Sequence, residues 1–186
     1  GSQFSQLNTP QSQINAVRKK YEGTSQWMKA PNGEPTKLNE MQWLQVRTPN
    51  FKAWFGDWEN DAKNASKVVD SETKEPMVVY HGTPNDFSEF AKEKQKEGDL
   101  GKGFYFTDNK ANASSWSRGG NVMPVFLTGT TAIQAIENGN PAKSRNLLIS
   151  KWRTSNVFVA TNPTQIKSAT DNTGEFNPTN PDIRFS

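Results

Sequence analysis

The sequence predicts an α+β protein in which a mainly antiparallel sheet follows a helical N-terminal extension. Two observations support this fold class. Up to about residue 62, apolar residues recur at helical spacing, whereas from residue 66 onward short β-rich runs alternate with Gly, Asn and Pro. We therefore expect residues 1–62 to form the extension and residues 63–186 to form the main domain.

Two helices are predicted early in the extension. In the first, Ile14, Val17 and Tyr21 fall on one face, and the helix is expected to end near Gly23. The second is predicted to begin after Asn39, whose side chain is suited to cap it, and to end at Thr48-Pro49. Its apolar residues are Met41, Trp43, Leu44 and Val46.

A third helix is predicted in "NFKAWFGDWEND". Phe51, Trp54, Phe55 and Trp58 recur there at i, i+3, i+4 and i+7, which is typical of an amphipathic helix. We expect its aromatic face to dock on the main domain rather than to stack on a cofactor or to enter a membrane.

The main domain is predicted to contain several short strands. "KVVDSETKEPMVVYHGT" reads as strand, turn and strand, and "GFYFTD", "VMPVFLTG" and "NVFVATNP" read as further strands. "DNKANASSWS", capped by Asp108 or Asn109, and "TAIQAIENG" are predicted to be short helices. Ile183 and Phe185 are expected to hold the tail against the body as a last edge strand.

Composition excludes several kinds of function. The 186 residues include no Cys and one His, which excludes disulfides, Cys-ligated zinc and a thiolate nucleophile. We expect no metal. No apolar run is long enough to span a bilayer, so we expect no membrane partner. The 22 basic and 19 acidic residues are scattered, which favours a solvated surface over a nucleic-acid-binding stripe.

The first two residues, Gly1 and Ser2, are typical of an expression remnant. We therefore expect the chain to be part of a longer protein. We also expect it to be monomeric and cytoplasmic.

The single histidine stands in "VVYHGTPNDF", residues 78–87, directly before Gly82 and Thr83. Such a histidine either closes a strand with a structural hydrogen bond or binds a ligand. Two further segments bear on this choice, "GKGFYFTDNKANASSW" and "NVFVATNPTQIK". The first carries Tyr105 and, eleven residues later, Trp116. Taken singly, both aromatic residues would be assigned to the core.

Together, the order and spacing of these segments resemble the ADP-ribosyltransferase superfamily. The similar branch contains diphtheria toxin and the poly(ADP-ribose) polymerases, and includes domains from polyvalent proteins of phages and mobile elements. Its members have a strand ending in Tyr/Trp-His-Gly-Thr/Ser and a second element reading Gly-x-Gly-x-Tyr-Phe/Ser-x-Asp/Glu. This sequence has "YHGT" and "GKGFYFTD" in that order. The resemblance covers about residues 67–167 and implies a split antiparallel β-sheet core.

The resemblance implies NAD+ as substrate and a set of residues that bind it. His81 would hydrogen-bond a ribose hydroxyl, and the backbone of Gly82 would read the nicotinamide carboxamide. Tyr105 and Trp116 would sandwich the nicotinamide ring, Trp116 standing where the family has Tyr. Supporting roles fall to Thr83, which would steady the turn, and to Gly101 and Gly103, which would let the strand pass beside the ligand.

The third catalytic element departs from the family pattern. Family members carry a glutamate on a late strand, and alignment through "NPTQIK" places Val157 there, beside Asn156. Glu175 and Asp108 are the candidate substitutes, Asp108 being also a candidate helix cap. Without that glutamate we expect no elongation into poly(ADP-ribose). The candidate catalytic residues are His81, Tyr105, Asn156, Val157 and Glu175.

The resemblance therefore implies an NAD-dependent mono-ADP-ribosyltransferase, a toxin or effector that modifies a host protein or, as a second option, a nucleic acid. The alternatives are an inactive relative that binds NAD, ADP-ribose or a partner, and an NAD glycohydrolase. A nucleic-acid binder or nuclease is supported only by the basic charge balance. Lys151, Arg153 and Lys167 either meet the pyrophosphate or are solvated surface.

Overall fold

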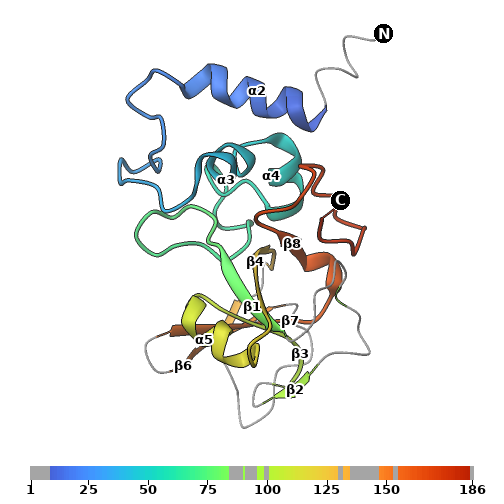
Figure 1. Cartoon of the computed structure of the whole chain (residues 1–186). Helices are drawn as coiled ribbons and strands as arrows, with labels where there is room; N and C mark the ends of the chain where they lie inside the picture. The colour runs from blue at the N-terminus through green and yellow to red at the C-terminus, as the bar shows by residue number, and fades with distance from the viewer. Residues whose placement is uncertain are drawn as a thin grey trace.

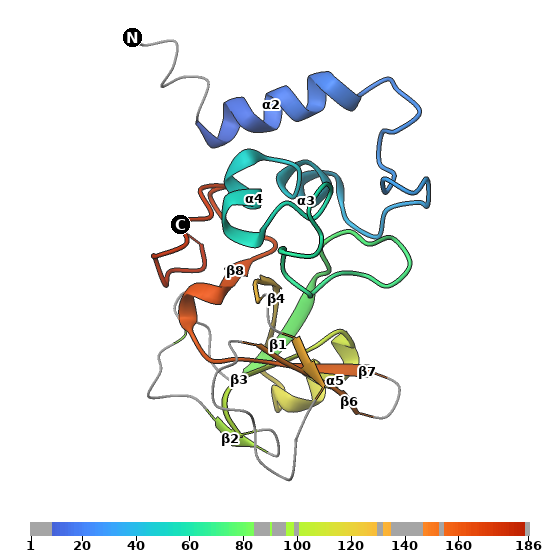
Figure 2. The same ribbon diagram turned by 180° about the vertical axis from the view of Figure 1, so that it is seen from behind.

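The structure is a computed structural model that describes residues 9–83, 90, 96–98, 101–129, 132–134, 147–152 and 155–184. In Figure 1 the N-terminal helices lie above the sheet, and the C-terminal tail returns beside them. Figure 2 shows the same layers from behind. The first and last parts of the chain are therefore neighbours in space.

The described N-terminal residues form helices α2 (Pro10–Tyr21), α3 (Glu40–Gln45) and α4 (Pro49–Phe55). Each helix begins at a side-chain cap. Thr9, Asn39 and Thr48 each accept a hydrogen bond from the backbone N–H three residues further on. The predicted helices are confirmed, and Asn39 is the predicted cap.

The third helix is shorter than its aromatic spacing predicts. It ends at Phe55 because Gly56 has φ of 102°, a conformation that ends a helix and favours glycine. Trp58 lies beyond the helix but is still only 4% exposed, and its indole N–H donates to the carbonyl of Val46 at 2.8 Å. The aromatic face is buried as predicted.

The strands form one mainly antiparallel sheet. They are β1 (Val79–Thr83), β2 (Lys96–Gly98), β3 (Gly101–Thr107), β4 (Asn121–Leu127), β5 (Ala132–Gln134), β6 (Leu147–Trp152), β7 (Ser155–Ala160) and β8 (Ile166–Ser168). Their order is β5-β6-β7-β3-β1-β4-β8, with β2 paired to β3 outside this path. Among these pairs, only β5 and β6 run parallel. The predicted α+β class is confirmed.

The sheet is split between β1 and β3. All five residues of β1 pair with β4, but the register between β1 and β3 contains the single pair Tyr80 and Thr107. From Thr107 the ladder continues into β7, where Thr107 pairs with Val157. Tyr80, Thr107 and Val157 therefore form one row on the same face of the sheet.

Helix α5 (Lys110–Trp116) covers that face and confirms the helix predicted in "DNKANASSWS". Its cap is Asn109, whose side chain accepts from the backbone N–H of Asn112 at 3.2 Å. A 3-10 turn, η2 (Pro163–Gln165), connects β7 to β8.

Three sequence predictions were wrong in detail. Residues 67–70 form no strand, because Val69 makes only an isolated bridge with Pro76. In "TAIQAIENG" a helix was predicted, but Ala132–Gln134 is strand β5, paired with β6, and the other residues of that segment lie outside the described residues. The predicted edge strand of the tail is also wrong for the described residues, because the last strand is β8 (Ile166–Ser168). Ile183 nevertheless holds the tail, since it is 1% exposed and its carbonyl accepts a hydrogen bond from the N–H of Ser168, whereas Phe185 is outside the described residues.

One apolar cluster joins the helical segment, residues 10–55 with α2, α3 and α4, to the rest of the protein. Phe51 of α4 contacts Phe126 of β4 and Phe176 of the tail, with ring centroids 5.2 and 5.0 Å apart. All three rings are fully buried. Burial of this aromatic surface stabilises the contact between the helices and the sheet.

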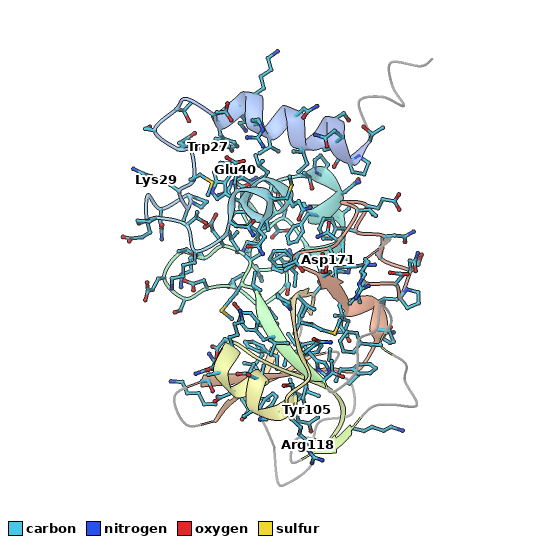
Figure 3. All side chains as sticks on the ribbon, in the orientation of Figure 1. Trp27, Lys29, Glu40, Tyr105, Arg118 and Asp171 are labelled. Atoms are coloured by element: carbon cyan, nitrogen blue, oxygen red, sulfur yellow. The ribbon has the colours of Figure 1, made fainter. Side chains whose placement is uncertain are left out.

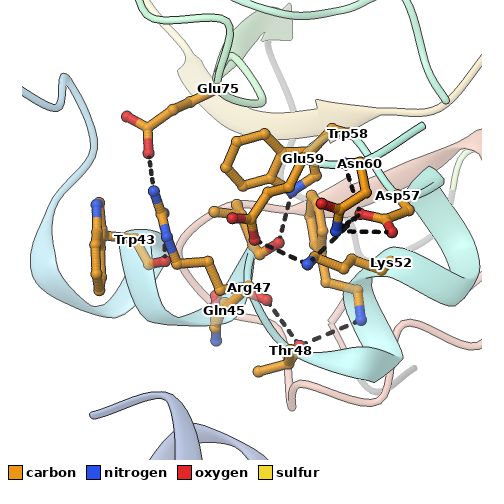
Figure 4. Close-up of polar contacts among 12 residues, drawn as sticks. Trp43, Gln45, Arg47, Thr48, Lys52, Asp57, Trp58, Glu59, Asn60 and Glu75 are labelled. Atoms are coloured by element: carbon orange, nitrogen blue, oxygen red, sulfur yellow. Dashed lines mark hydrogen bonds and ion pairs between the residues drawn. The ribbon is translucent and has the colours of Figure 1, made fainter. Parts of the chain in front are cut away.

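A buried ion pair lies beside this cluster. Arg47, which follows α3, donates to Glu75 at 2.7 Å, and the two side chains are 4% and 1% exposed (Figure 4). The guanidinium also lies 3.8 Å from the ring centroid of Trp43. Among the described helices, none combines the length and the apolar character that crossing a membrane requires.

Candidate functional site

His81 bridges the split between β1 and β3. Its Nδ1 lies 2.8 Å from the carbonyl oxygen of Tyr105. Because a carbonyl oxygen only accepts hydrogen bonds, Nδ1 carries the proton and donates. In the neutral ring Nε2 is then an acceptor, which can accept a hydrogen bond from a hydroxyl group.

The imidazole is held on its other sides by aromatic rings. Its centroid lies 4.9 Å from that of Phe90 and 5.3 Å from that of Phe106. Both rings belong to the apolar cluster under the sheet. His81 is therefore a half-buried, rigidly held group, with its ring orientation set by packing and by one hydrogen bond.

Gly82 lies directly beneath α5. A Cβ built on Gly82 would overlap the carbonyl oxygen of Ala113 and come within 2.9 Å of the backbone nitrogen of Ser117. Only glycine permits this close approach of helix and strand. The structure thus gives Gly82 a packing role, and the predicted contact of its backbone with a carboxamide stays a prediction.

Tyr105 and Trp116 come together on the α5 face. Tyr105 lies on β3 and Trp116 at the end of α5, and both pack against one apolar cluster formed by Leu148, Val157 and Val159. In Figure 3, Tyr105 is labelled at the end of the molecule opposite the helical segment. Neither aromatic side chain is fully buried.

Val157 lies in the same row of the sheet as Tyr80 and Thr107, and it packs beside this aromatic pair. Its side chain is 7% exposed and belongs to the same cluster as Tyr105 and Trp116. The neighbouring Asn156 is bound by Asp108, whose two carboxylate oxygens accept from the backbone N–H and the side-chain amide of Asn156 at 2.9 and 2.8 Å. Asp108 thus ties the end of β3 to the start of β7.

Residues 71–150 match the family model described as ADP-ribosyltransferase in polyvalent proteins. This segment, which is less than half of the chain, is similar to that family. The family uses NAD+ as its substrate. No curated protein matches the chain.

The matched ADP-ribosyltransferase segment contains β1, β3 and α5, and with them all predicted NAD-binding residues. These are His81, Gly82, Thr83, Gly103, Tyr105 and Trp116. Strand β7, with Asn156 and Val157, follows the match, as does Glu175. The family match therefore includes the predicted nicotinamide-binding residues. It does not include the predicted third catalytic element, which lies on β7 and in the tail.

Thr83 and Gly103 lie on the strands flanking the split. Thr83 is 6% exposed at the end of β1, opposite Asn121 of β4. A Cβ on Gly103 would overlap the Val159 side chain, so this glycine allows β3 to approach β7 closely. Gly103 thus helps to place Tyr105, two residues along.

Glu175 is an exposed residue of the tail beyond β8, apart from the split. It lies near Lys167 of β8, which is fully buried and donates to the carbonyl of Asn180 at 2.8 Å. Burial lowers the pKa of Lys167 to about 8, and the nearby carboxylates of Asp182 and Glu175 partly oppose that shift. The Lys167 side chain is therefore buried and holds the tail against β8, and it is not part of the solvated surface.

Lys151 is exposed on β6 and pairs in register with Asn156, whereas Arg153 lies outside the described residues. Within the described ranges, no group of three or more His, Asp or Glu side chains could hold a metal ion. A cavity of about 320 Å³ lies at Tyr80 and Asp108, and Lys37 and Leu38 of the helical segment form part of its wall. The helical segment thus contributes to the surroundings of the matched residues 71–150.

Sequence reasoning missed the partners of β7. Asp108 was considered as a cap or as a substitute acid, whereas its carboxylate binds Asn156. Asn112 and Ser155, which hydrogen-bond each other at 2.8 Å, were not singled out. The only signal for them was the excess of Asn and Ser around "TDNKANASS", which equally fits helix capping.

Proposed function

We propose that the protein is an NAD-dependent mono-ADP-ribosyltransferase that transfers ADP-ribose to a host macromolecule and releases nicotinamide. The observation that supports it most is the split between β1 and β3. His81 spans that opening to the carbonyl of Tyr105, and both residues lie, with Trp116, in the part of the chain that matches the ADP-ribosyltransferase family model. The acceptor we favour is a host protein, and the setting is that of a toxin or effector of a phage or mobile element acting in a bacterial cytoplasm.

The site binds the nicotinamide half of NAD+ in this proposal. Nε2 of His81 accepts a hydrogen bond from a ribose hydroxyl, because Nδ1 donates to the carbonyl of Tyr105. The rings of Tyr105 and Trp116 flank the nicotinamide, where offset stacking on an aromatic face is favourable. The β3-facing backbone edge of Gly82 reads the carboxamide, since β1 and β3 share no register pair there.

The reaction follows from this binding. The bond between nicotinamide and C1″ of the ribose breaks, and nicotinamide leaves with the bonding electrons. The resulting oxocarbenium ion is captured at C1″ by a nucleophile of the acceptor, which forms the new bond and loses a proton to solvent. The site accelerates the reaction by binding this cationic transition state more tightly than NAD+ itself.

Val157 explains the restriction to one ADP-ribose unit. Its side chain is apolar and buried against Leu148 and Val159, so no carboxylate at this position can activate a further ribose hydroxyl. The same observation favours a second candidate function, an inactive relative that binds NAD or ADP-ribose without turnover. An NAD glycohydrolase, which transfers ADP-ribose to water, is a further alternative.

The test is to incubate the full chain with labelled NAD+ and a bacterial lysate, and to follow label transfer and nicotinamide release together. The matched variants are His81→Ala and Ser114→Ala, the latter an exposed position on α5. We expect wild type and Ser114→Ala to label macromolecules and His81→Ala to lose at least about 100-fold in transfer. Thermal unfolding of each variant shows whether it is folded.

The outcomes separate the candidates. Nicotinamide release in equal amounts with and without lysate, and no macromolecular label, identifies a glycohydrolase. Saturable NAD+ binding without release in either setting identifies the inactive relative. Absence of both binding and release by the folded wild type rules out all three.

A further inference from the structure

The turn after β3 is bound to the start of β7 through Asp108. One carboxylate oxygen accepts from the backbone N–H of Asn156 at 2.9 Å, and the other accepts from its side-chain amide at 2.8 Å. The backbone N–H of Asp108 approaches the carbonyl of Asn156 at 3.4 Å. A single ionised side chain thus satisfies both N–H groups of one residue, and such charge-assisted bonds are the stronger ones.

A second tie reinforces the first. The side-chain amide of Asn112, in the first turn of α5, donates to the hydroxyl of Ser155 at 2.8 Å. Ser155 is 3% exposed, so this contact is shielded from water. The beginning of α5 and the beginning of β7 are therefore held together at two successive residues, Ser155 and Asn156.

These ties lie next to the wall of the proposed nicotinamide site. Val157 follows Asn156 directly and packs in the same cluster as Tyr105 and Trp116. A slip of β7 by one residue would turn Val157 to the opposite face of the sheet and remove it from that cluster. Whatever fixes the start of β7 therefore also fixes the wall on which the two aromatic rings rest.

We infer that Asp108 is a positioning residue for NAD+ binding: through Asn156 it holds β7 in register, and thereby sets the wall against which Tyr105 and Trp116 form the nicotinamide slot. This inference rests on the proposed function. Asp108 acts through its two bonds to Asn156 and does not touch the reacting atoms. Its negative charge is not required, provided that the two hydrogen bonds are made.

A side-chain exchange tests this inference. Asp108→Asn leaves an amide that can accept only one of the two bonds, and Asn156→Asp places two carboxylates face to face. In the double exchange, the amide now at position 108 accepts from the backbone N–H of residue 156 and donates to the new carboxylate there, so both bonds are restored. We expect each single variant to weaken NAD+ binding about tenfold and the double variant to return to within about threefold of wild type.

The matched control is the exchange of Asp61 and Asn64, an exposed Asp–Asn pair in the loop after α4. All variants are measured in the full chain for NAD+ affinity by titration calorimetry and for unfolding by urea. We expect the control variants to bind NAD+ as wild type does. The affinity readout and the rescue in the double variant are effects that a merely stabilising contact would not produce in folded protein.

Three results contradict the inference. Unchanged NAD+ affinity in folded Asp108→Asn overturns it while leaving the proposed function intact. A folded double variant that binds NAD+ as weakly as the single variants also overturns it. The carboxylate of Asp108 would then be required for a reason other than its two hydrogen bonds to Asn156. Failure of wild type to bind NAD+ removes the proposed function, and the inference with it.

Discussion

At the residue scale, His81 was predicted either to close a strand or to bind a ligand, and the structure shows that its Nδ1 bridges the gap to β3. That bond fixes the neutral tautomer in which Nε2 is a hydrogen-bond acceptor. The structural interpretation and the proposed ligand-binding role of His81 are therefore compatible, because they use different ring nitrogens.

Gly82→Ala is a residue-scale test of the helix–strand contact. The added methyl group would overlap the carbonyl oxygen of Ala113, and backbone atoms cannot rotate away. We expect the free energy of unfolding to fall by about 1–3 kcal/mol, measured by urea denaturation. Ser114→Ala, exposed on the same helix, should unfold as wild type does, and a Gly82→Ala protein as stable as wild type would refute the packing role.

Lys167→Met tests the buried amine by its pH dependence. Since burial lowers the pKa of Lys167 to about 8, the unfolded chain binds more protons than the folded one between pH 8 and the ordinary lysine value of 10.5. Stability contributed at this position therefore rises with pH across that interval. The neutral amine keeps two N–H donors for the carbonyls of Asn180 and Asp182.

We expect the unfolding free energy of wild type, relative to Lys167→Met, to increase by about 1.5 kcal/mol from pH 8 to pH 9.5. The measurement is a set of urea titrations of both proteins at fixed ionic strength. A difference that stays constant or shrinks over this range would show that Lys167 keeps its proton in the folded state.

At the element scale, local sequence signals set the limits of helices better than those of strands. Asn39 caps α3 through a capping box with Gln42, and Gly56 ends α4, both from chemistry contained within a few residues. Ala132–Gln134 instead became a strand because β6 provides a partner for it. Pairing with a neighbouring strand overrides the local preference for a helix. Because the paired strand lies more than ten residues further along the chain, a short stretch of sequence does not reveal it.

Removing the ion pair of Arg47 and Glu75 tests how strongly it holds the helices to the segment before β1. Arg47→Leu would leave Glu75 buried at 1% exposure without its cation, so we expect a loss of about 3–5 kcal/mol in unfolding free energy. Arg47→Leu combined with Glu75→Leu should recover part of this loss, because no buried charge remains. Chemical denaturation of wild type, Arg47→Leu, Glu75→Leu and the double variant closes the cycle, and equal losses in the single and double variants would argue against a coupled pair.

At the scale of the whole molecule, the division into residues 1–62 and 63–186 stays a prediction. The helices and the later residues share one apolar cluster, in which Phe51 and Trp54 contact Phe176 of the tail. Trp54 also donates through its indole N–H to the carbonyl of Thr164 at 2.9 Å. The helical segment is thus packed as part of the core and not as a separate appendage.

Removal of residues 1–62 is the corresponding experiment. The truncated chain would expose the rings of Phe126 and Phe176, both buried in the whole protein, and leave Glu75 without Arg47. We expect it to lose cooperative thermal unfolding or to aggregate, as followed by circular dichroism and size-exclusion chromatography. A soluble fragment with a sharp transition would establish residues 63–186 as an independent domain.

The sequence by itself determined the α+β class, the caps at Asn39 and Asn109, and the order and spacing of His81, Tyr105 and Trp116 that resemble the family pattern. These features depend on side-chain chemistry and spacing along the chain, which a sequence contains directly. Only the tertiary structure decided that Gly82 packs under Ala113, that Asp108 binds Asn156, and that Glu175 lies with Lys167 away from the split. The contacts of Gly82 with Ala113 and of Asp108 with Asn156 join residues dozens of positions apart, and the fold selects them through pairing register and burial.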